Sequence, residues 1–135
     1  MALITWGSAL EVGNKDIDSQ HKVLVDLVNG LNDAMTQGKG KEILGKLLKE
    51  LIDYTVSHFA MEERLMQTHA YPDRDKHMKE HTDLKATVTK LQGEFASGKV
   101  TITLQVMSFL KEWLSNHILK TDKALGAYLA SKSVK

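Results

Sequence analysis

The chain has 135 residues, enough for one domain with a buried core that needs no disulfide bond. Its 18 Lys and Arg residues nearly balance 17 Asp and Glu residues, leaving a formal net charge of +1, and the basic residues are scattered, so we expect neither nucleic acid nor an anionic membrane surface as a partner. Cysteine is absent, which excludes disulfides, thiolate zinc sites and cysteine-ligated iron–sulfur clusters and leaves imidazole and carboxylate as the strong metal ligands.

The first 17 residues are expected to form an extended arm laid over the domain. They show no helical period and contain Gly7, Gly13 and Asn14. They also lack a basic segment followed by an apolar one, and no apolar run in the chain approaches the roughly 20 residues needed to span a bilayer. We therefore expect a cytoplasmic protein without membrane insertion.

Four stretches after the arm have the period of an amphipathic helix, because apolar residues recur at steps of three and four. The repeating positions are Leu24, Val28, Leu31 and Met35; Leu44, Leu48 or Leu51, Thr55 and Leu65; Leu84, Val88, Leu91 and Phe95; and Val106, Leu110 and Trp113. The sequence therefore predicts four amphipathic helices.

Residues that favour turns and helix ends separate these helices. They are, in chain order, Asp18 or Ser19, Gly38 with Gly40, Pro72 with Asp73, Gly98, and Thr101 or Thr103. Short links between antiparallel neighbours predict an all-α, up-down-up-down four-helix bundle. We expect a single domain over residues 1–135, with the arm (1–17), the bundle (18–121) and a short C-terminal helix and tail (122–135), and a monomer.

Six potential metal ligands lie in the inward register of the predicted helices. They are His21, His58, Glu62, His77, His81 and His117. Residues four apart on an α-helix are offset by only about 40° and about 6 Å, so His58 with Glu62, and His77 with His81, can each chelate a metal. His21 and the pair His77 and His81 come early in their helices, whereas the pair His58 and Glu62 and the single His117 come late. Because neighbouring helices of the bundle are antiparallel, all six residues should lie at the same end of it.

Asp122 is a seventh potential ligand, five residues after His117. On a regular α-helix that spacing rotates Asp122 by about 140° away from His117. A wide π-type turn or a helix end between Leu119 and Asp122 would bring the carboxylate back, and such turns are common at functional sites. The sequence therefore predicts a break in helical register after His117.

The donor set favours two metal ions over one. Five imidazoles and two carboxylates are too many for one tetrahedral zinc and too rich in nitrogen for calcium or magnesium. If both carboxylates bridge together with an oxide or hydroxide, a metal with three histidines has six ligands and a metal with two histidines has five. Such a set suits iron or manganese, and the open position suits O₂. Without a metal, each unsatisfied buried nitrogen would cost about 1 to 3 kcal/mol.

Several separated motifs occur together in this chain. They are Ile4-Thr5-Trp6, the run from Ile17 to Lys22, the stretch from His58 to Met66 followed by Tyr71-Pro72, the pair His77 and His81, and Trp113 to His117 with Asp122 five residues further on. In this order they resemble the hemerythrin family, in particular its single-domain bacterial members, over nearly the whole chain. The resemblance implies reversible O₂ binding at a non-haem di-iron centre, for oxygen transport, storage or delivery, with an O₂-consuming enzyme as one candidate recipient.

The resemblance also implies ligand roles. His77, His81 and His117 would hold the six-coordinate iron, His21 and His58 the five-coordinate iron at which O₂ binds, and Glu62 and Asp122 would bridge the two, together with the oxo or hydroxo bridge. From spacing, we assign Leu24, Trp113, Leu114 and Ile118 to an apolar lining of the O₂ pocket. Ordinary core packing explains these four residues at least as well. Glu63 is expected to be a surface carboxylate or a partner of a ligand, and His69 a solvated turn residue outside the site.

Three other functions compete with that of an oxygen carrier, which is not an enzyme. A ferritin-like di-iron oxidase would need Glu-x-x-His motifs on two helices, and none occurs in this chain. An O₂ or redox sensor usually needs an attached output domain. Peroxidase activity or handling of nitric oxide at the same site stays open, because the ligands alone do not distinguish it from O₂ binding.

Overall fold

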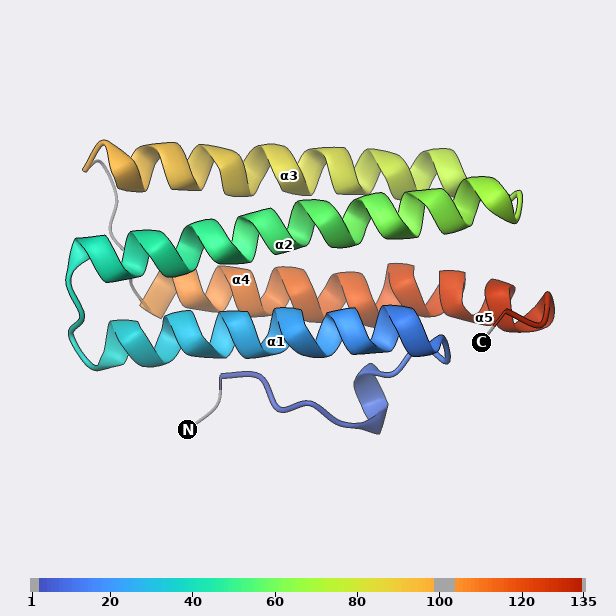
Figure 1. Ribbon diagram of the computed structural model, residues 1–135, viewed down its shortest axis with the longest axis horizontal. Coiled ribbons are helices and arrows are strands. Elements are labelled where there is room, and N and C mark those ends of the chain that lie inside the picture. Colours follow the sequence, from blue (N-terminus) through green and yellow to red (C-terminus); the bar gives the residue numbers. More distant parts are fainter. Residues whose placement is uncertain (1–2, 99–103, 135) are drawn as a thin grey trace.

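Four long helices lie side by side and run in alternating directions (Figure 1). The computed structural model describes residues 3–98 and 104–134. Its elements are the short 3₁₀ helix η1 (Ser8–Leu10), α1 (Lys15–Thr36), α2 (Lys41–Thr68), α3 (Arg74–Ala96), α4 (Leu104–Asn116), the π-helix η2 (His117–Asp122) and α5 (Lys123–Ser131). This arrangement confirms the expected all-α, up-down-up-down bundle with an N-terminal arm and a short C-terminal helix.

Helix α1 begins at Lys15, earlier than the expected start near residue 18. Asn14 is the N-cap, and its side-chain Oδ1 accepts a hydrogen bond from the Ile17 N–H at 3.0 Å. Asp18, which was expected to be a cap, instead accepts hydrogen bonds from the backbone N–H groups of Val12 at 2.7 Å and Gly13 at 3.3 Å. The prediction of a cap at Asp18 or Ser19 is therefore wrong, because Asp18 binds the arm from within the first turn.

The other helix ends follow the predicted turn residues. Gly38 and Gly98 lie just beyond α1 and α3 with positive φ angles of 72° and 83°, a conformation that glycine adopts without strain. Helix α3 begins at Arg74, directly after Pro72 and Asp73. The proposed openings of the fourth helix at Thr101 or Thr103 fall outside the described residues.

The core runs along the centre of the bundle and receives side chains from every long helix. Buried members include Leu24, Leu31, Leu48, Phe59, Val88 and Leu110. Leu91 and Val106 are only partly buried, because with Phe109 they line a groove between α3 and α4 that is open to solvent. Within residues 3–98 and 104–134, none of the helices has the length and apolar character of a membrane span.

The N-terminal arm is tied to the bundle at two places. The backbone N–H of Ile4 donates to the Asn29 side chain at 2.9 Å, and the Asn29 amide donates back to the Ile4 carbonyl at 2.8 Å. Further along, Val12 passes so close to Gly126 of α5 that a Cβ on that glycine would overlap the Val12 carbonyl oxygen. The arm thus packs closely against α5, which directly follows η2.

Candidate metal centre

The seven predicted ligands lie together inside the bundle, where the start of α1, the later part of α2, the start of α3 and η2 meet. They are His21, His58, Glu62, His77, His81, His117 and Asp122, and each is at most 4 % exposed. They form two overlapping groups in which all candidate ligand atoms lie within 4.8 Å of one another. Both groups contain Glu62 and Asp122.

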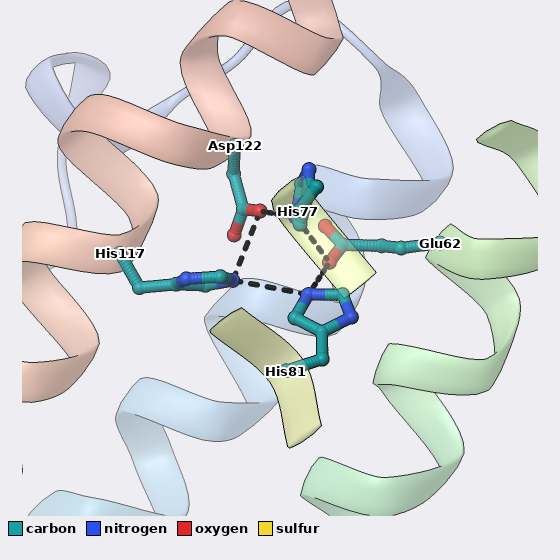
Figure 2. A group of neighbouring side chains, drawn as sticks. All are labelled: Glu62, His77, His81, His117 and Asp122. Carbon is teal, nitrogen blue, oxygen red and sulfur yellow. Dashed lines mark hydrogen bonds and ion pairs between the residues drawn. The ribbon is translucent and has the colours of Figure 1, made fainter. Parts of the chain in front are cut away.

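The larger group adds three histidines to the two carboxylates (Figure 2). The Nε2 of His81 lies 3.1 Å from Glu62 Oε1. The Nε2 atoms of His77 and His117 each lie 3.1 Å from Asp122 Oδ1. The Nε2 atoms of His81 and His117 are 3.2 Å apart, so all three rings direct the same nitrogen to one small volume.

The smaller group adds two histidines to the other oxygens of the same carboxylates. The Nε2 of His21 lies 2.8 Å from Asp122 Oδ2, and the Nε2 of His58 lies 3.3 Å from Glu62 Oε2. Each carboxylate therefore presents one oxygen to the three-histidine group and the other to the two-histidine group. This is the placement that two bridging carboxylates between unequal metal positions would require.

Asp122 reaches the centre because the backbone from His117 to Asp122 is a π-helix. The i→i+5 hydrogen bonds of a π-helix bring residues five apart over one another, where an α-helix would separate them. The predicted break in helical register after His117 is confirmed. The sequence signal for it was the five-residue spacing between two residues that both have metal-binding side chains.

A metal fits this donor set, because many of the buried polar atoms have no hydrogen-bond partner within the described residues. They are both ring nitrogens of His21 and His77, the Nε2 of His58 and all four carboxylate oxygens of Glu62 and Asp122. The short distances between imidazole and carboxylate therefore lack hydrogen-bond geometry. Because an unsatisfied buried polar group is costly and native proteins contain few of them, a cluster of this size fits a site that holds cations.

The electrostatics of the cluster also favour positive charge. Burial lowers the pKa of His21, but the carboxylates of Asp122 and Glu62 outweigh that effect and raise it to about 9. In His117 the same balance raises the pKa to about 10. Burial raises the pKa of the Glu62 and Asp122 carboxyls, but the surrounding histidines hold both below their usual range. The two carboxylates thus stay ionised and attract the charge that metal ions would supply.

Three of the five histidines have a partner on the nitrogen that faces away from the centre. The Nδ1 atoms of His58, His81 and His117 lie 2.7 Å from Gln20, 3.0 Å from Glu63 and 2.6 Å from Glu80, respectively. Such contacts fix the orientation of a metal-binding imidazole and raise its basicity. Glu63 had been expected to be either a surface carboxylate or a ligand's partner, and it is the latter.

Sequence reasoning missed Gln20 and Glu80. Gln20 precedes His21 in the chain but contacts His58 on another helix, and Glu80 is 37 residues away from its partner His117. No spacing along the chain reports such contacts between helices. The one signal was that both polar residues lie next to an inward histidine, His21 or His81, on the same helix.

The proposed lining residues of the O₂ pocket are all buried. Their exposed fractions are 1 % for Leu24, 8 % for Trp113, 2 % for Leu114 and 1 % for Ile118. Burial agrees with a pocket lining and equally with ordinary core packing. Phe59, which the sequence reasoning did not single out, stacks on His81 with ring centroids 3.8 Å apart and so places an aromatic face against the centre.

His69 belongs to neither ligand group. It is the C-cap residue of α2, and its carbonyl accepts a hydrogen bond from the Tyr128 hydroxyl at 2.7 Å. It is partly buried rather than fully solvated, but its expected place outside the site agrees with the structure.

Known proteins resemble this chain in sequence and in fold. The family model for the hemerythrin HHE cation binding domain matches residues 12–129. A bacteriohemerythrin from Methylococcus capsulatus is 41 % identical over 97 % of this chain and 100 % of its own length. A bacteriohemerythrin from Pseudomonas aeruginosa is 37 % identical over 90 % of this chain and 78 % of its own length. A crystal structure of wild-type hemerythrin superposes with a TM-score of 0.90 at 38 % identity, covering 96 % of this chain and 99 % of that one.

Proposed function

Because this chain belongs to the hemerythrin family, we propose that it binds O₂ reversibly at a non-haem di-iron centre and acts as an oxygen carrier or store rather than an enzyme. The proposed ligands are the seven clustered residues. His77, His81 and His117 would hold one iron, His21 and His58 the other, and Glu62 with Asp122 would bridge them. When bound, the irons supply the electrons and the open coordination position for O₂.

The observation that carries this proposal is that the same two carboxylates belong to both ligand groups, one with three histidines and one with two. Glu62 and Asp122 each direct one oxygen to three histidines and the other to two. If both carboxylates bridged two ions, the ion held by two histidines would have one protein ligand fewer than the ion held by three. That difference would leave a position for a small molecule at one iron only.

The remaining residues of the site orient the ligands and surround them. Gln20, Glu63 and Glu80 accept a hydrogen bond from the outward nitrogen of a ligand histidine, which fixes the ring and leaves its other nitrogen free to bind metal. Phe59 covers His81, and we propose that Leu24, Trp113, Leu114 and Ile118 form the apolar wall of the O₂ pocket.

A carrier is favoured over an oxidase or peroxidase because the proposed ligand set is rich in nitrogen. Five of the seven proposed ligands are histidines, whereas a ferritin-like di-iron oxidase uses a carboxylate-rich set with Glu-x-x-His motifs on two helices. A nitrogen-rich centre suits reversible binding better than turnover.

We also propose that residues 1–135 act as one domain and as a monomer. The hydrogen bonds between Ile4 and Asn29, and the close approach of Val12 to Gly126, support an arm that belongs to the same folding unit as the bundle. Light scattering of the purified protein checks the monomer, and a dimer at micromolar concentration would contradict it.

Anaerobic reconstitution tests the proposed function. Metal-free protein loaded with ferrous iron should bind two irons per chain, develop a visible charge-transfer band on exposure to O₂, and lose that band when O₂ is removed. Zinc-loaded protein is the matched control, because zinc is redox-inert and should give no band. Repeated turnover with an added reductant, releasing more than one hydrogen peroxide per centre, would instead assign an oxidase.

A further inference from the structure

Glu80 contacts both the first and the fifth residue of η2. Its Oε1 accepts a hydrogen bond from the His117 Nδ1 at 2.6 Å, and the Thr121 hydroxyl donates to the same carboxylate, at 2.8 Å from Oε1 and 2.9 Å from Oε2. We propose that Glu80 and Thr121 are positioning residues that hold the π-helical turn and so aim the Asp122 carboxylate at the centre. The inference rests on the proposed function, because it concerns the same ligand set.

The turn needs an outside constraint because a π-helix is rare and is seldom longer than a single turn. If residues 117–122 returned to α-helical spacing, Asp122 would rotate away from His117 by about 140°. Thr121 directly precedes Asp122 in the chain. Fixing the Thr121 side chain to α3 therefore fixes the backbone from which the Asp122 side chain departs.

Glu80 differs from the other two partners of the ligand histidines. Gln20 contacts His58 and Glu63 contacts His81, each through one hydrogen bond to a ring. Such a contact can orient an imidazole but does not constrain the chain beyond it. Only Glu80, among these three, also binds a residue that is not a proposed ligand.

The other end of this region is held independently. Helix α5 follows η2 directly, and its Gly126 lies against the backbone of Val12 in the arm. A return of η2 to α-helical spacing would shift α5 along its axis, against this contact. The Glu80 bonds on one side and the arm on the other thus leave η2 little room to change its spacing.

The Thr121 hydroxyl can be removed without changing the shape of the side chain. We expect Thr121→Val to weaken zinc binding to the metal-free protein by about 10-fold in calorimetry, the lower end of the range for losing a direct partner of a metal ligand, because Thr121 acts on the ligands through Glu80 and the backbone of the turn. In the zinc-loaded variant, amide hydrogen exchange over residues 117–122 should become faster. Thr121→Ser, which keeps the hydroxyl, should restore both properties towards the wild type.

Thr87→Val is the matched control, since the Thr87 hydroxyl donates to the Asp83 carbonyl on the exposed face of α3. It should leave zinc affinity and exchange at 117–122 unchanged. Wild-type affinity and exchange in Thr121→Val would overturn the proposal. Weaker zinc binding without faster exchange in η2 would also overturn it, because the effect would then not pass through the turn.

These measurements are separate from the test of O₂ binding. They use zinc, so they succeed or fail whether or not the iron form binds O₂ reversibly. If the iron form proves to be an oxidase, faster exchange in Thr121→Val still supports the positioning role. If zinc does not bind the wild-type protein, the ligand assignment fails and this inference fails with it.

Discussion

Asp122 Oδ1 lies 3.1 Å from the Nε2 of His117, although the two residues belong to the same helical segment and are five positions apart. The contact exists only because that segment is a π-helix. It places the second carboxylate opposite Glu62, so that each half of the centre is joined to the other by two side chains.

Replacing Asp122 by Asn should therefore remove a bridge without changing the size of the side chain. We expect iron loading to fall from two ions to one or none, because an amide supplies one neutral oxygen where the carboxylate supplies two charged ones. Metal analysis after anaerobic reconstitution measures this. Asp73→Asn, at an exposed carboxylate before α3, is the control and should load normally. If Asp122→Asn still bound two irons per chain, Asp122 would not be a bridging ligand.

The clustering of the seven proposed ligands could be predicted from the sequence because much of the information is local. Spacings of four place His58 with Glu62, and His77 with His81, on one helical face, and antiparallel topology gives their common depth. The contacts of Glu80 could not be predicted, since its partners lie on another helix at a separation of 37 and 41 residues. The groove that leaves Leu91 half-exposed depends on the distance between α3 and α4. The spacing of apolar residues along one helix carries no information about that distance.

Removing a ligand histidine should lower metal content and stability together, because metal binding and folding are coupled. We expect His77→Ala and His117→Ala to lose iron and to unfold at a lower temperature than the wild type in the iron-loaded form. His69→Ala is the control, since His69 lies outside both ligand groups. Metal analysis combined with thermal unfolding by circular dichroism measures both properties. Full iron loading of either ligand variant would contradict its assignment.

Leu114→Ala tests the proposed apolar wall of the O₂ pocket. Leu114 is 2 % exposed, and if it lines the proposed pocket, shortening it would open space that water could enter beside the centre. We expect faster autoxidation of the O₂-bound form, followed as loss of the visible band over time. Leu44→Ala, in the first turn of α2 at the opposite end of the bundle, controls for general loss of packing. If both variants autoxidise at the wild-type rate, Leu114 is an ordinary core residue.

The contact between Gly126 and Val12 predicts that the arm stabilises the segment after η2. In Gly126→Ala, the new methyl group would overlap the Val12 carbonyl oxygen and lie 2.9 Å from the Val12 carbonyl carbon and Cβ, so backbone must move. We expect a loss of about 1 to 3 kcal/mol in the free energy of unfolding, the usual range for overpacking. Urea unfolding of the metal-loaded protein measures it.

Gly93→Ala is the matched control for that substitution. Gly93 lies in α3 on the exposed surface, and a Cβ there meets nothing within 4 Å. Because alanine is the better helix former, the free energy of unfolding of this variant should be higher than that of the wild type by about 0.5 to 1 kcal/mol. If Gly126→Ala also raised the free energy of unfolding, the arm would have to move away from α5 without cost. Opposite signs, together with faster amide exchange in residues 123–131 of Gly126→Ala, would instead identify the arm as a constraint on α5 and, through it, on the position of Asp122.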